Sequence, residues 1–119
     1  MKRTIFLCIF LLACLGASAQ SDYYERQARS HQNDAEYYFK QAQSHDRDVE
    51  YYMREAAGHM RDAEYYQRQK QYEQARSSLR KARNAIDKAE SSRSRADNAR
   101  SNAKSCLRRA EDALQNVKK

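Results

Sequence analysis

The sequence contains no Pro, no Trp and only two Gly among its 119 residues. Pro and Gly form most turns of β-hairpins and α/β folds, so their scarcity argues against sandwiches, barrels and α/β domains. Large aliphatic side chains are also scarce, because much of the 40% hydrophobic content is Ala and Tyr and the mean hydropathy is −1.15. A compact enzyme core needs more Leu, Ile, Val and Phe. The composition therefore argues against an enzyme and leaves a helical rod, a coiled coil or a disordered polyampholyte.

The N-terminal segment has the pattern of a secretory signal peptide. A short basic start precedes an apolar run at 4–15, and the small residues 17–19 read Ala-Ser-Ala. This pattern predicts a signal peptide over residues 1–19 that is cleaved before Gln20. The apolar run would span only about 18 Å as a helix, less than a bilayer core of roughly 30 Å. We therefore expect an exported chain in the periplasm or cell envelope, or secreted into the medium.

The three cysteines raise two further questions. Residues 11–14 read Leu-Leu-Ala-Cys and look like a lipobox, in which Cys14 would be lipidated and become the mature N-terminus. After simple cleavage before Gln20, only Cys106 would remain. A lone Cys in an oxidising compartment indicates either an intermolecular disulfide or a small buried side chain, and both interpretations stay open for Cys106.

A fourteen-residue repeat dominates residues 20–67. Fourteen residues are two heptads, the period that keeps one stripe of a helix facing a partner. The stripe combines an Ala row, with one Val, and a row in which Tyr and His alternate. Its members are Tyr24, Ala28, His31, Ala35, Tyr38, Ala42, His45, Val49, Tyr52, Ala56, His59, Ala63 and Tyr66. We expect this stripe to be the buried seam of an acidic coiled-coil helix.

Residues 72–119 continue the heptads with different side chains. One row consists of Ala75, Ala82, Ala89, Ala96, Ala103 and Ala110, followed by Val117. We expect the second buried row to be Tyr72, Leu79, Ile86, Arg93, Arg100, Leu107 and Leu114. On this interpretation, Ala85, Ala99 and Ala113 occupy a flanking position.

The two heptad arrays are out of phase at residues 68–71, by about 200° around the helix. Charge separates at the same point, because residues 20–67 carry 6 basic and 10 acidic side chains whereas residues 68–119 carry 15 and 6. Both features favour an antiparallel hairpin of two helical arms. However, residues 67–71 are good helix formers without a turn residue. One continuous helical rod that associates with a second copy therefore stays open.

Three His-x-x-Asp pairs are the candidate metal ligands. They are His31 with Asp34, His45 with Asp48, and His59 with Asp62. Each pair lies on one helical face and could supply two ligands to a site that a partner helix completes. Successive histidines are about 21 Å apart along a helix, so one helix cannot bring them to the same ion. We favour their role as polar seam residues, with no metal and no cofactor.

Residues 95–119, with Ala-spaced heptads and an Asn-Val-Lys-Lys ending, resemble the murein lipoproteins of enteric outer membranes. The Leu-Leu-Ala-Cys segment would match the lipid attachment of that family. The resemblance implies a small exported coiled coil in which Cys14 carries lipid and Lys119 is joined to peptidoglycan.

These observations predict a non-enzymatic, exported coiled-coil structural or interaction protein of the periplasm or cell envelope. Two alternatives stay open: an envelope lipoprotein that contacts peptidoglycan, and a metal- or ligand-binding helical module that uses the His-x-x-Asp repeats. The expected partners are a second copy or another helical envelope protein. The positive charge of the basic arm also indicates an anionic envelope surface as a partner. No nucleic acid is expected, because the chain is predicted to be exported.

Overall fold

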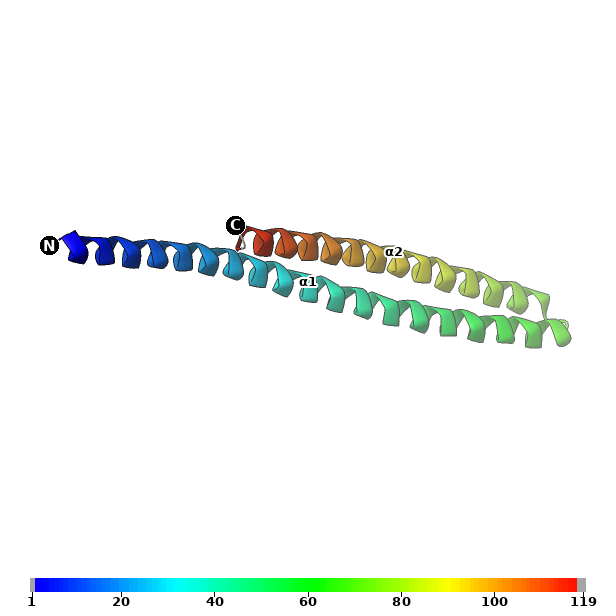
Figure 1. Ribbon diagram of the computed structural model, residues 1–119. Coiled ribbons are helices and arrows are strands. Elements are labelled where there is room, and N and C mark those ends of the chain that lie inside the picture. Colours follow the sequence, from blue (N-terminus) through cyan, green and yellow to red (C-terminus); the bar gives the residue numbers. More distant parts are fainter. Residues whose placement is uncertain (1, 118–119) are drawn as a thin grey trace. The chain divides into compact units, whose positions relative to one another are not determined.

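The computed structural model describes the backbone of residues 2–117 and the side chains of residues 20–117 (Figure 1). This part of the chain forms two helices, α1 (Lys2–Arg68) and α2 (Tyr72–Val117), and contains no strand. The all-α prediction is confirmed. The side chains of the expected signal peptide, including Cys14, and Lys119 lie outside the described residues. Among the described residues, no helix has an apolar stretch that suffices to cross a membrane.

The chain divides into two compact units, each with one segment of α1 and one of α2. The turn unit comprises Tyr38–Ser101, and the terminal unit comprises the described parts of Met1–Tyr37 and Asn102–Lys119. In the turn unit the segments of α1 and α2 run side by side in opposite directions, joined by residues 69–71 (Figure 1). The hairpin prediction is therefore confirmed, and the alternative of one helix that continues through this segment is wrong.

The turn between the helices is a Schellman motif that has Lys where Gly is usual. Lys70 adopts the left-handed conformation with φ 57°. The backbone N–H of Gln71 donates to the carbonyl of Tyr66 (2.8 Å), and that of Lys70 donates to the carbonyl of Gln67 (3.0 Å). These two bonds satisfy carbonyls at the end of α1. A non-Gly residue pays about 1–2 kcal/mol for this conformation, so the residue types gave no sign of the turn.

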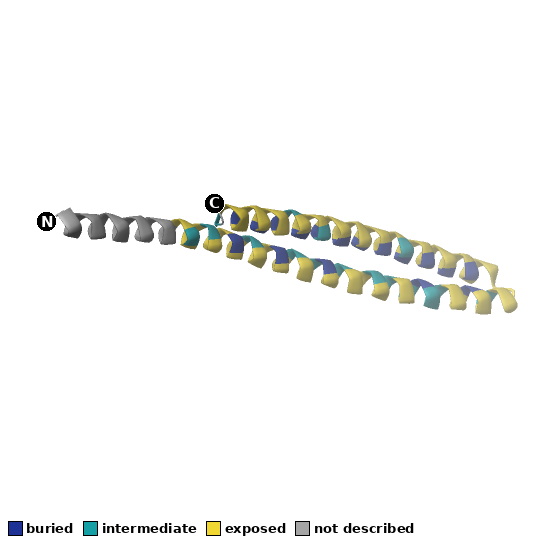
Figure 2. Ribbon diagram, in the orientation of Figure 1, coloured by how far each residue is buried: buried dark blue, intermediate teal, exposed yellow. Residues whose placement is uncertain are grey.

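The seam predicted for α1 is confirmed (Figure 2). Its Ala row is only 1–4% exposed, and it consists of Ala28, Ala35, Ala42, Ala56 and Ala63. Val49 and the alternating Tyr and His residues of the other row are half-buried. The Ala row thus faces α2 directly, whereas the rings of the second row lie along the border of the interface.

Of the two rows predicted to be buried on α2, one is confirmed and the other is wrong. The Ala row is buried as expected, but the second buried row is Ser78, Ala85, Ser92, Ala99, Cys106 and Ala113. The expected row is displaced outward, since Tyr72, Leu79, Leu107 and Leu114 are 41–60% exposed, Arg93 is exposed, and Ile86 and Arg100 are half-buried. The reason is steric: α1 fills one side of its seam with Tyr and His rings, so α2 must contribute small side chains.

We call the buried rows of α1 and α2 the small-residue seam. In the terminal unit, Ala28 of α1 packs with Ala110 and Ala113 of α2, so one small side chain meets two. Small residues on both helices favour an interaxial distance near the lower end of the usual range of about 8–10 Å. Many weak contacts of this kind stabilise the helix pair, because each buried methyl contributes only about 1 kcal/mol.

Candidate interaction surfaces

The turn unit has an apolar edge beside its seam. Asp46 and Arg100 form an ion pair from α1 to α2, which shows that their two heptad rows are neighbours. Seven-residue steps along the same rows lead to large apolar side chains on both helices, which we call the apolar edge: Met53, Met60, Leu79 and Ile86. Met53, Met60 and Leu79 are 44–46% exposed, and Ile86 is half-buried. Leu79 and Ile86 belong to the row expected inside the seam, whereas Met53 and Met60 lie outside the expected seam of α1.

A charged group lies on the same two rows. The Nη1 atom of Arg100 lies 2.8 Å from Oδ2 of Asp46, and its Nη2 atom lies 2.8 Å from Oδ1 of Asp97. The hydrogen bonds to Asp97 and Asp46 raise the pKa of Arg100. Arg93, one heptad before Arg100, forms no ion pair within residues 20–117. The rows therefore combine apolar anchors with a fixed charged position.

The opposite edge of the turn unit is polar. Glu55 and His59 of α1 line a shallow depression with Lys81 and Lys88 of α2. The Nζ atom of Lys88 also lies 5.8 Å from the ring centroid of Tyr52, at the distance of a cation–π contact. At this edge one acidic side chain of α1, Glu55, thus lies beside two basic side chains of α2.

The terminal unit has its own apolar patch. Leu107 and Leu114 of α2 are 52% and 41% exposed. They border a surface hollow together with Lys104 and with Gln32 of α1. These leucines belong to the row expected inside the seam. The segments of α2 in both units therefore expose this row.

Each of three Tyr-Tyr pairs has one ring beside the seam and one ring on the surface. In each described pair the ring centroids are 5.4–5.5 Å apart and the ring planes are 66–70° from parallel, an edge-to-face arrangement. These pairs are Tyr23 with Tyr24, Tyr51 with Tyr52, and Tyr65 with Tyr66. The second ring of each pair is half-buried beside the seam, whereas the first is 53–57% exposed. The outer ring therefore supports the inner one and remains accessible.

The candidate metal ligands stay in separate pairs. The Nδ1 atom of His45 lies 3.9 Å from Oδ2 of Asp48, and it is buried without a hydrogen-bond partner. His31 and His59 are half-buried, and Asp34 and Asp62 are exposed. Within residues 20–117, no three His, Cys, Asp or Glu side chains gather as a metal site would require. The observed positions of the three histidines are those expected for seam residues.

Cys106 is 6% exposed and forms no disulfide. It occupies one of the small-residue positions of α2 in the terminal unit. Its sulfur could reach a second chain only if α1 and α2 separated there. The geometry thus favours the interpretation of Cys106 as a small buried side chain over that of an intermolecular disulfide.

The sequence contained one signal for the apolar edge. Ala85, Ala99 and Ala113 recur every fourteen residues, and this second Ala row marks the buried side of α2 better than the Leu and Ile residues do. Small residues at two of every seven positions predict close helix packing, which pushes larger residues outward. Comparison of the chain with protein-family models, curated proteins and solved structures gave no match, so any function is inferred from this sequence and geometry alone.

Proposed function

We propose that this chain is an exported, non-catalytic helical hairpin that serves as a structural or interaction protein of the periplasm or cell envelope. The observation that carries the proposal is the division of side chains on α2. Ala, Ser and Cys form the contact with α1, whereas Leu79, Leu107 and Leu114 lie exposed. Large apolar side chains that recur on an exposed helix face are typical of protein interaction sites.

The partner that best fits the apolar edge is another helix. Met53 and Met60 lie seven residues apart on α1, as do Leu79 and Ile86 on α2. Anchors at this spacing fit between the side chains of a helix that lies along them. A second copy of the chain or another helical envelope protein would satisfy this geometry, and the signal-peptide pattern supports an envelope location.

Site-specific photo-crosslinking in cells tests the proposed edge. A photoreactive residue in place of Met60 should give a defined protein adduct, whereas the same group in place of Arg47, an exposed residue of α1 in the same unit, should not. Replacement of Met53 by Gln should weaken the adduct from position 60. Equal adducts from both positions, or none from position 60, would contradict the proposed use of the edge.

The exported state has a separate test. Mass spectrometry of the mature chain from the periplasmic fraction should find Gln20 at its N-terminus. A diacylated Cys14 would support the lipoprotein alternative instead, and an intact N-terminus in the cytoplasmic fraction would overturn both.

A further inference from the structure

The turn end of the turn unit concentrates positive charge. Residues 65–83, which we call the basic tip, contain six basic side chains and one acidic side chain. Residues 20–64 and 84–117 together contain 13 basic and 15 acidic side chains. The excess positive charge of the described side chains therefore resides at the tip. The six side chains are Arg68, Lys70, Arg76, Arg80, Lys81 and Arg83.

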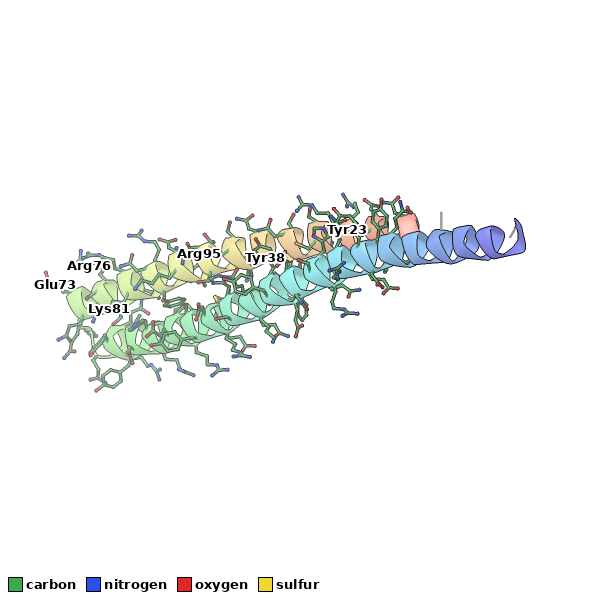
Figure 3. The ribbon with its side chains drawn as sticks, turned by 90° about the vertical axis from the view of Figure 1, so that its left-hand side faces the viewer. Tyr23, Tyr38, Glu73, Arg76, Lys81 and Arg95 are labelled. Carbon is green, nitrogen blue, oxygen red and sulfur yellow. The ribbon has the colours of Figure 1, made fainter. Side chains whose placement is uncertain are left out.

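The basic side chains of the tip are exposed and weakly neutralised. The single acid, Glu73, lies 4.0 Å from Arg76, and these side chains are 94% and 70% exposed, so water screens their attraction. Figure 3 shows both side chains on the first turns of α2, pointing away from α1. Among residues 20–117, Lys70, Arg80 and Arg83 form no ion pair. The tip thus presents its charge to an external anion.

Apolar side chains lie among these charges. Tyr72 is 60% exposed, and Leu79 is 46% exposed. Leu79 lines a surface hollow together with Arg76, Arg80 and Arg83, so an apolar side chain lies beside three basic ones. A soluble polyanion needs only the charges. A bilayer with anionic headgroups offers both phosphates for the guanidinium groups and an acyl boundary for Leu and Tyr.

Lys70 adds an independent observation. It occupies the left-handed position of the turn, where Gly avoids the steric cost. The chain therefore places a positive charge at the point where the helices reverse, at the expense of local strain. Such strain tends to mark functional positions.

We propose that the basic tip docks on the surface of an anionic lipid bilayer. The guanidinium and ammonium groups contact lipid phosphates, and Tyr72 and Leu79 enter the headgroup region. This interaction places the hairpin tip against the membrane. It uses Leu79, the member of the apolar edge nearest the turn, and leaves Met53 and Met60 accessible to a protein partner. The inference does not depend on the function proposed for the apolar edge.

Co-sedimentation of the purified mature chain with lipid vesicles tests this proposal. The chain should bind vesicles of equal parts phosphatidylglycerol and phosphatidylcholine, and it should not bind phosphatidylcholine alone. Each basic side chain near an anionic surface strengthens partitioning about fivefold. The triple variant Arg76→Gln, Arg80→Gln, Arg83→Gln should therefore partition about 100-fold more weakly. High salt should weaken binding of the unmodified chain in the same direction.

A matched control removes the same charge elsewhere on α2. The variant Arg95→Gln, Arg108→Gln, Arg109→Gln should bind almost as well as the unmodified chain. A second variant, Tyr72→Ser with Leu79→Ser, should also lose binding although it keeps every charge. Circular dichroism establishes that each variant remains helical.

Two results would overturn the proposal. An equal loss of vesicle binding in the two triple variants would show that binding depends on total charge and not on the tip. Full binding by the Tyr72→Ser, Leu79→Ser variant, together with displacement by a soluble polyanion such as heparin, would show a polyanion site without membrane insertion.

Discussion

The guanidinium group of Arg100 on α2 lies 2.8 Å from the carboxylate of Asp46 on α1, 54 positions earlier in the chain. The same guanidinium also binds Asp97, one turn before it on α2. Both side chains of the interhelical pair are 40–49% exposed, so solvent screens their attraction. The pair therefore contributes more to the register of the two helices than to their stability.

A double-mutant cycle measures this contact between the helices. Asp46→Asn and Arg100→Gln should each destabilise the hairpin slightly in urea unfolding at low salt. The double variant should lose less than the sum of the two, because the pair is already broken by either change. The coupling should fall as salt is added. Strictly additive effects at low salt would show that the contact does not form in solution.

Enlargement of a seam residue should destabilise the hairpin. Ala96 is 0% exposed, so the extra methylene groups of Ala96→Leu have no space between the helices. We expect a loss of about 1–3 kcal/mol in the free energy of unfolding. The control is Asn98→Leu, at an exposed position two residues later, which should change stability by less than about 0.5 kcal/mol. A stabilising effect of Ala96→Leu would mean that the small-residue seam is not tightly closed.

Replacement of Lys70 by Gly should stabilise the turn. Lys70 has a positive φ, and Gly adopts this conformation without a Cβ clash. We expect a gain of about 1 kcal/mol in thermal or urea unfolding. Arg68→Gly, two residues earlier in the last turn of α1, should instead cost about 0.5–1 kcal/mol. A loss of stability from Lys70→Gly would contradict the left-handed turn.

Tyr51 should titrate at a higher pH than a free tyrosine. Its hydroxyl donates to Oε1 of Glu55 at 2.9 Å, and this hydrogen bond, followed by the negative charge of Glu55, raises the pKa of Tyr51. Because the folded pKa lies above the unfolded one, the stabilisation is complete below the unfolded pKa. It is lost as the pH rises through the folded pKa.

NMR titration of the tyrosine ring carbons in the chain and in Glu55→Gln measures this shift. The variant should lower the pKa of Tyr51, because it removes the carboxylate that accepts the hydrogen bond from the hydroxyl. An unchanged pKa of Tyr51 in the variant would show that the hydrogen bond to Glu55 is absent in solution.

The heptads predicted much of this fold because a repeat fixes which face of a helix is buried. Ala28 and His31 take their expected places on α1, since the fourteen-residue unit leaves one stripe free of charge. On α2, apolar character alone predicts that Leu79 is buried, whereas the smaller Ser78 takes the buried position. Where two helices pack closely, a small side chain is buried in preference to a large apolar one, and the row of Ala85, Ala99 and Ala113 is the sign of this in the sequence.

The turn and the surfaces were less accessible to sequence reasoning. The phase break placed the reversal within residues 68–71, but no turn residue stands there, since Lys70 takes the role of Gly. The apolar edge combines Met53 with Ile86, which are distant in the chain, so it required the register of the two helices. The basic tip likewise joins the end of α1 to the start of α2.

The distance between two labels across the turn unit tests the hairpin most directly. Gln43→Cys and Asn98→Cys, both exposed, are combined with Cys106→Ala, which keeps a small residue in the seam. With spin labels and an excess of unlabelled chain, the hairpin predicts an intramolecular distance below about 30 Å, because neighbouring helix axes lie about 8–10 Å apart. A distance near 80 Å, expected for one continuous helix at about 1.5 Å per residue, would contradict the hairpin.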